Sequence, residues 1–446
     1  MEIEFDNRAQ RLTRTSLEIC LMLMVFTMPW APKFTILFTI LSFVVVIVSH
    51  FFFKTEPFNK KRVSLFFMLV GFYLLHFIGI LYSDDSKSAW FDIEIKMTLL
   101  LSPLFFLFAN SRLITLITIK RVVGMFVLGL FLMVLWRWTI IGIDVIDTGI
   151  YDKLFYKSLA GEQHPTYLSL YLVFAIAVLI FNHLPDAVIN IKHYLKIRLL
   201  ILFLFGLFLV MLSSRAALLS SVGLAILIIL FDRRNKPVER FSTGCWYGSL
   251  VAGSRAQIGR FKSVNSPYLD VVVALGIPFL LISLMRPVAV NRFAQIENVI
   301  TNDTTIARAV SEESTVQRMM ILKSSLKVIK STWMTGVGTG DIHDALERQF
   351  LADHANYSAQ QNYNPHDQYL QTMIGLGLPG LLLLLIMLYG PLLYLRERIN
   401  LVYLSFILVF GFNLLFESML ERQAGVLFYA LFNPLFLAAM LNYKRG

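Results

Sequence analysis

Long apolar runs alternate with short polar connectors along most of this chain. A helix that crosses the hydrocarbon core of a bilayer needs roughly 20 predominantly apolar residues. On that criterion the sequence predicts spans at 17–31, 34–53, 63–82, 97–109, 122–141, 166–182, 198–213, 216–231, 270–285, 366–391, 400–415 and 424–441. The pattern therefore predicts an all-α fold, a polytopic transmembrane helix bundle of about twelve spans.

Composition supports a membrane location. Hydrophobic residues make up 57% of the chain, Phe occurs 38 times and the mean hydropathy is +0.67. A soluble core of this size cannot bury that much apolar surface, whereas a bilayer is itself apolar. The two cysteines, Cys20 and Cys245, fit no metal-binding or disulfide spacing.

The net charge of +11 lies mainly in the connectors. The connectors 54–62, 110–121, 183–198 and 392–399 are rich in Lys and Arg, whereas those at 83–96 and 142–165 are acidic. Cytoplasmic loops of membrane proteins carry such a basic excess. We therefore predict cytoplasmic termini, outward-facing acidic connectors, a lipid bilayer as partner and no nucleic acid as partner.

Two longer connectors interrupt the pattern. Residues 232–269 are basic and rich in Gly and Ser, and we interpret them as a cytoplasmic loop. Residues 286–365 are predicted to form an outer helical subdomain, with an amphipathic helix over 315–334. The domain organisation is thus 1–285 with nine spans and the loop 232–269, then the subdomain 286–365, then 366–446 with three spans.

Three arginines are candidates for binding an anion at the outer face. Arg215 follows two serines in a predicted tight hairpin, Arg292 opens the long outer loop and Arg318 lies near the start of the amphipathic helix. The guanidinium fork matches phosphate oxygens, but each arginine alone also fits a snorkelling or solvated charge. The glycine-rich run 335–340 could cradle phosphate, although it lacks the Lys-Ser/Thr of a phosphate-binding loop.

His366 and Asp367 stand at the predicted outer mouth of a helix. Imidazole titrates near neutral pH and suits proton transfer from a hydroxyl, whereas the alternative is a helix-capping polar cluster. Polar clusters at two other outer helix mouths occupy 162–167 and 417–422. His164 and His366 lack carboxylates or cysteines at metal-ligand spacing, so we predict neither a metal nor another cofactor. Such an outer face suits a substrate with a lipid tail and a phosphate head.

The sequence resembles the O-antigen ligase / O-antigen polymerase superfamily. The resemblance rests on 213–217 (Ser-Ser-Arg-Ala-Ala), on the stretch from Arg318 to Gly340, on 366–370 (His-Asp-Gln-Tyr-Leu) with its following glycines, and on the helix order around one long outer loop. The segments 164–167 and 417–423 also resemble relatives of the Bacteroidetes type.

The resemblance implies a metal-independent, inverting glycosyltransferase of the bacterial inner membrane, with a periplasmic active face and a donor glycan on undecaprenyl diphosphate. It further implies that Arg215 and Arg292 hold the diphosphate with support from Arg318, and that His366 is the catalytic base. Further candidates for the acceptor or donor site are His164, Tyr167, Asp367, Tyr369, Glu417 and Arg422.

The alternative transferase functions differ in the molecule that accepts the glycan. A ligase transfers the glycan to lipid A–core in lipopolysaccharide biosynthesis, and this is the reaction that we expect. A polymerase joins carrier-linked repeats with the same donor chemistry, and transfer to protein is a further alternative. A polysaccharide flippase or transporter is a different class, which would place charged residues along a pathway through the helix centres.

Overall fold

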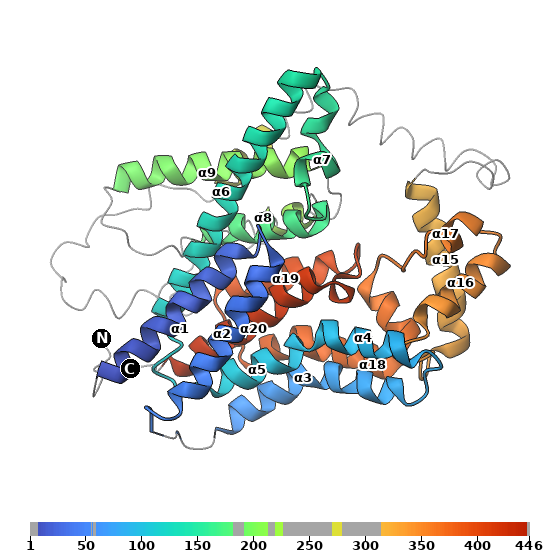
Figure 1. The fold of residues 1–446 in the computed structure, drawn as a ribbon, viewed down its shortest axis with the longest axis horizontal. Helices are drawn as coiled ribbons and strands as arrows, with labels where there is room; N and C mark the ends of the chain where they lie inside the picture. Colours follow the sequence, from blue (N-terminus) through green and yellow to red (C-terminus); the bar gives the residue numbers. More distant parts are fainter. Residues whose placement is uncertain are drawn as a thin grey trace.

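The computed structural model describes residues 8–54, 56, 59–181, 191–212, 219–225, 270–278 and 314–443, and these residues are helical with no strand (Figure 1). This confirms the predicted all-α class. The helices are α1 (Arg8–Thr27), α2 (Pro32–Ser49), α3 (Lys60–Ile80), α4 (Ser86–Lys96), α5 (Thr98–Phe108), α6 (Leu116–Thr148), η1 (Tyr151–Leu154), α7 (Tyr156–Ala160), α8 (Pro165–Ile180), α9 (Ile191–Met211), η3 (Val272–Gly276), α15 (Ser314–Thr332), α16 (Ile342–Ala352), α17 (Asn356–Gln360), α18 (Gln368–Tyr394), α19 (Leu401–Asn413), η4 (Met419–Glu421) and α20 (Gln423–Asn442).

Side chains in the connectors fix where several of these helices begin. Asn59 caps α3 by accepting a hydrogen bond from the amide of Lys61, and Thr115 caps α6 in the same way. Pro165 occupies the first turn of α8, where its missing N–H costs no helical hydrogen bond. Gly149 ends α6 in the left-handed conformation that glycine adopts easily.

Among the described helices, α2, α3, α6, α18 and α20 are long and apolar enough to cross a membrane. The prediction of about twelve spans is therefore not confirmed. The apolar helices α8 and α19 have 16 and 13 residues, which is short for a bilayer that requires roughly 20. Every residue of α8 from Leu168 to Ile180 is buried, so this helix forms the centre of the bundle. Hydropathy alone did not separate such buried helices from lipid-facing ones.

An aromatic cluster joins the central helices. Phe174 of α8 packs its ring against Phe406 of α19 and against Phe428 and Phe432 of α20, with ring centroids 5.3–5.6 Å apart. Phe126 of α6 contacts Phe432 from the other side, at 5.2 Å. Buried aromatic pairs of this kind add to the apolar packing. The four helices thus form one rigid support for the connectors at their ends.

The basic connectors and the C-terminal end of α20 meet at one end of the molecule. Arg62 donates hydrogen bonds to the Asn442 side chain at 2.7 Å and to the Ala109 carbonyl at 3.1 Å. Asn442 in turn donates to the Ile114 carbonyl at 2.8 Å. The start of α1 and the end of α20 lie at this end, and α15, α16 and α17 lie at the opposite end (Figure 1). The side of the membrane that each end faces stays a prediction.

Several predicted features lie outside the described residues. These are Arg215, Arg292, Cys245, the loop 232–269, most of the span 216–231 and the end of the span 270–285. The described part of the last span begins with Asp270, which forms a buried ion pair with Arg198 of α9. This pair joins the start of that segment to α9, which packs against η3.

The helix predicted over 315–334 is α15, and it packs against α16 and α18. Its buried side carries Ile321, Ser325 and Val328, whereas Lys323 and Lys327 are exposed. The amphipathic pattern therefore corresponds to a helix with one face on its neighbours. Helices α15 to α17 share a small apolar core that includes Ile374 of α18, which attaches them to the membrane bundle.

A break inside α18 creates the attachment point. Gly377 has φ 60° and ψ −157°, a region that essentially only glycine adopts. Two residues later Pro379 has no N–H, so the carbonyl of Gly375 loses its usual helical donor. The amide of Leu378 is also diverted, because it donates to the carbonyl of Trp333 at 2.8 Å instead of to the preceding turn.

The glycine-rich run 335–340 supplies the missing donors. The amide of Val337 donates to the carbonyl of Ile374 at 2.8 Å, and the amide of Gly338 donates to that of Gly375 at 2.9 Å. A Cβ added at Gly336 would lie 2.3 Å from the Gly375 carbonyl oxygen, so a side chain has no room there. These glycines serve close backbone contact with α18. The amides of Val337 and Gly338 are occupied and are not donors for a phosphate.

Candidate functional site

His366 lies at the mouth of α18, in an unusual backbone conformation. Its φ is +51°, a left-handed value that few residues other than glycine adopt, although His is enriched among them. The Asn364 side chain accepts a hydrogen bond from the His366 amide at 3.0 Å, and Pro365 between them is buried. Strained backbone of this kind is often found at functional sites, and here it sets the direction of the imidazole.

The imidazole of His366 faces a buried carboxylate. Its Nδ1 lies 3.6 Å from Oε2 of Glu417, whose side chain is 7% exposed. This distance is an ion-pair contact and not a hydrogen bond. Nδ1 is buried and has no hydrogen-bond partner among the described residues, while the whole His366 side chain is 27% exposed. The exposed part of the ring therefore lies away from Nδ1 and includes the Nε2 side.

Further charges surround this pair. Burial alone would raise the pKa of Glu417, but the charges of His366, His164 and Arg318 more than offset it and leave that pKa below its usual range. Burial lowers the pKa of His164, and the Arg422 charge acts in the same direction. The site therefore contains an ionised Glu417 beside two histidines. The charges of His164, His366, Glu417, Arg422 and Arg318 therefore lie close enough to influence one another.

Tyr167 and Tyr363 complete the surroundings. Tyr167 is 2% exposed, and its hydroxyl has no hydrogen-bond partner within the part of the chain that the structure describes. Its ring centroid lies 5.9 Å from that of His164. The Tyr363 ring lies 5.7 Å from the His366 ring. Tyr363 was not singled out from the sequence, although it precedes His366 by only three positions.

Two of the predicted site residues have local structural contacts instead. Asp367 is the N-cap of α18 and accepts a hydrogen bond from the amide of Leu370 at 2.9 Å, which is the capping alternative considered above. The Tyr369 hydroxyl donates to the Gly411 carbonyl at 2.8 Å and lies 3.3 Å from the Tyr389 hydroxyl. Tyr369 thus joins α18 to α19, and its hydroxyl is occupied within the bundle.

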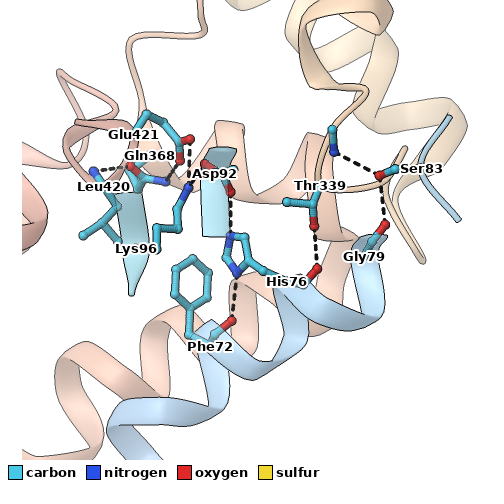
Figure 2. Close-up of polar contacts among 11 residues, drawn as sticks. Phe72, His76, Gly79, Ser83, Asp92, Lys96, Thr339, Gln368, Leu420 and Glu421 are labelled. Atoms are coloured by element: carbon cyan, nitrogen blue, oxygen red, sulfur yellow. Dashed lines mark hydrogen bonds and ion pairs between the residues drawn. The ribbon is translucent and has the colours of Figure 1, made fainter. Parts of the chain in front are cut away.

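A buried polar network next to the site was not predicted from the sequence (Figure 2). Lys96 of α4 is fully buried and contacts both Asp92 and Glu421, the latter at 2.9 Å. Glu421 also accepts a hydrogen bond from Gln368 at 3.0 Å, and His76 of α3 lies 3.6 Å from Asp92. The signal available was the i, i+4 spacing of Asp92 and Lys96 together with a histidine inside an apolar run.

The His, Cys, Asp and Glu side chains of the described residues do not form a metal-binding group. Across residues 8–181, 191–225, 270–278 and 314–443, excluding the gaps named above, no three His, Cys, Asp or Glu side chains are grouped closely enough to hold a metal ion. What the mouth of α18 does offer is an imidazole, a paired carboxylate and a nearby arginine. These groups suit proton transfer and binding of an anion.

The fold and this polar helix mouth define a polytopic helical membrane protein with a candidate acid–base site at one end of the bundle. A model of the O-antigen ligase family matches residues 200–385, which include Arg215, Arg292, Arg318 and His366. This match confirms the resemblance to the O-antigen ligase superfamily that the motifs predicted. The family implies an enzyme that acts on carrier-linked polysaccharide in a membrane. No curated protein matches the chain.

Proposed function

We propose that this protein is an O-antigen ligase, which transfers a glycan from undecaprenyl diphosphate to a sugar hydroxyl of lipid A–core. The observation that carries the proposal is the pair of His366 and Glu417 at the mouth of α18, with Nδ1 and Oε2 3.6 Å apart. A base oriented by a buried carboxylate is the arrangement that proton abstraction from a hydroxyl needs. The family match supports a carrier-linked donor.

In the proposed reaction the acceptor oxygen attacks the anomeric carbon of the donor sugar. The new glycosidic bond forms as the bond to the diphosphate breaks, and His366 takes the proton of the acceptor hydroxyl. Undecaprenyl diphosphate leaves with the bonding electrons, and a single displacement inverts the anomeric centre. Because diphosphate is a good leaving group, this scheme needs charge stabilisation more than a strong acid.

Glu417 would hold the imidazole and stabilise its positive charge after the transfer. Because Nδ1 faces Glu417, Nε2 is the nitrogen that would take the proton from the acceptor hydroxyl. Long contacts at such sites often tighten when the substrate binds, so 3.6 Å is compatible with the role. Arg215 and Arg292 would bind the diphosphate with support from Arg318. This part of the proposal rests on the resemblance, because Arg215 and Arg292 lie outside the described residues.

The direct test of the base is His366→Ala in a deletion strain. We expect transfer to be lost, a change of about 10²–10⁴ in rate, while binding of undecaprenyl diphosphate persists. His366→Gln is the matched control, since glutamine retains hydrogen bonding but cannot take the proton at neutral pH. Near-normal transfer by His366→Gln would show that residue 366 only positions the acceptor.

The family match also supports an O-antigen or exopolysaccharide polymerase as a second candidate. Glycan analysis of the deletion strain separates the two enzymes. A ligase defect removes all O-antigen from lipid A–core and leaves polymer on the carrier. A polymerase defect leaves lipid A–core capped with single repeats. In either case we propose an inner-membrane location with a periplasmic active face.

A further inference from the structure

The buried network around Lys96 includes Gln368 and Glu421, which lie on the two segments that carry His366 and Glu417 (Figure 2). Gln368, two residues after His366, is 1% exposed. Its side chain donates to Oε1 of Glu421 at 3.0 Å and accepts from the amide of Leu420 at 2.7 Å. Its own amide donates to the carbonyl of Leu414 at 2.8 Å. Three hydrogen bonds thus join the mouth of α18 to the loop that contains Glu417.

Lys96 contacts Glu421, the carboxylate that accepts the hydrogen bond from Gln368. Its ammonium group is the one cation in contact with Glu421 among the described residues, at 2.9 Å. Lys96 also contacts Asp92 in its own helix, and Asp92 faces His76 of α3. A fully buried ammonium group is costly unless it is paired and hydrogen-bonded. The two carboxylates meet that requirement, so the position of Lys96 determines where the Glu421 carboxylate lies.

The pKa values of the two carboxylates in this network, Asp92 and Glu421, shift in opposite directions. Burial raises the pKa of Asp92, and the Lys96 charge only partly opposes it. Burial would also raise the pKa of Glu421, but Lys96 and the hydrogen bond from Gln368 more than offset it, and the pKa is lowered. The charges of Lys96 and Glu421 therefore stabilise each other. Removal of Lys96 would leave Glu421 as an uncompensated charge in the interior.

We propose that Lys96 is a positioning residue for glycan transfer, which fixes Glu421 and Gln368 and thereby aligns His366 with Glu417. This inference rests on the proposed function of His366. The chemistry of the donor and acceptor does not involve Lys96, because it is fully buried. Its effect is on how often the imidazole and the carboxylate adopt the productive geometry. Misplacement of a catalytic group by about 1 Å can cost about 10² in rate.

The test compares Lys96→Met with Arg62→Met in the full-length protein. Arg62 is the matched control, because it is also a buried, paired cation but lies at the opposite end of the bundle. The assay uses the carrier-linked glycan extracted from the deletion strain, with lipid A–core from the same strain as acceptor. We expect Lys96→Met to lower kcat by about 10–10² with KM for the donor within about threefold. Arg62→Met should leave both constants near wild type.

A charge-balanced double variant keeps the test decisive if Lys96→Met folds poorly. Lys96→Met/Glu421→Gln removes both members of the ion pair, and residue 421 can still accept the hydrogen bond from Gln368. We expect the double variant to recover most of the kcat that Lys96→Met loses. A double variant that melts normally but stays as slow as Lys96→Met would overturn the proposal, and so would wild-type kcat in Lys96→Met itself. His366→Ala is assayed in parallel to separate the two failures: normal transfer by His366→Ala would refute the proposed function, whereas loss of transfer by His366→Ala together with wild-type kcat in Lys96→Met would refute only the role of Lys96.

Discussion

Replacement of Glu417 by Gln should slow glycan transfer without unfolding the protein. When His366 takes a proton, a positive imidazolium forms 3.6 Å from the Glu417 carboxylate. Coulomb's law gives about 4–5 kcal/mol for unit charges at this separation with an effective dielectric constant of about 20, and about 1 kcal/mol in bulk water. Because the His366 side chain is 27% exposed, the real value lies between these limits. Glu417→Gln should therefore lower kcat by about 10–10³, since about 1.4 kcal/mol corresponds to a factor of ten.

The rate deficit of Glu417→Gln should depend on pH in the direction that the pKa of Glu417 sets. Glu417 has a pKa below its usual range, so its carboxylate is ionised at neutral pH. It becomes protonated, and stops stabilising the imidazolium, only as the pH falls through that lowered value. The rate deficit of Glu417→Gln should accordingly be full at neutral pH and should shrink only in acid.

The assay is the same transfer of carrier-linked glycan to lipid A–core, measured as kcat and KM across pH. Glu94→Gln is the matched control, because Glu94 is an exposed carboxylate of α4. It should behave as wild type. If Glu417→Gln retains kcat within about twofold at neutral pH, the electrostatic role of Glu417 is wrong, since even the bulk-water limit predicts more.

Four further predictions concern other parts of the molecule. Arg215→Ala should abolish transfer with normal expression, and Arg215→Lys should recover little because lysine lacks the bidentate fork; normal transfer by Arg215→Ala would exclude its role in diphosphate binding. In a background without native cysteines, single cysteines in 286–365 should react with an impermeant reagent in spheroplasts, and protection throughout would reverse the predicted orientation. Gly377→Ala should destabilise the protein by about 1–3 kcal/mol, because a Cβ there meets the Met334 backbone at 2.7 Å, whereas Gly390→Ala should not lower the melting temperature in detergent. EDTA should leave the transfer rate unchanged, and strong inhibition would contradict a metal-independent mechanism.

The sequence predicts that polar groups at several helix mouths form one site, and the structure places some of them within electrostatic reach of one another. His164, His366, Glu417 and Arg422 were selected because each stands where an apolar run begins or ends. Alternation of the spans then places such mouths on one side, whatever the details of packing. The structure brings the charges of these residues close enough to influence one another. Their catalytic roles stay predictions.

The number of spans was harder to predict, because hydropathy reports apolar character and not what surrounds it. Helix α8 is apolar because the other helices bury it completely, and α5 has only 11 residues. A central helix and a lipid-facing helix have similar composition. Lys96 was missed for a related reason: its partner Glu421 lies 325 positions away, and sequence spacing gives no sign of such contacts.

The glycine-rich run illustrates how a local motif can have a tertiary cause. Its glycines fit a phosphate cradle in isolation, yet the physical requirement comes from α18, about forty positions later. A helix interrupted by Gly377 and Pro379 leaves carbonyl groups without donors, and in a membrane protein water is rarely available to replace them. The amides of Val337 and Gly338 meet that requirement, and only residues without bulky side chains allow the two backbones to approach so closely. The hydrogen bonds to the carbonyls at the break also attach helices α15 to α17 to the span that begins two residues after His366. Helices α15 to α17 and the proposed base are therefore held on the same helix.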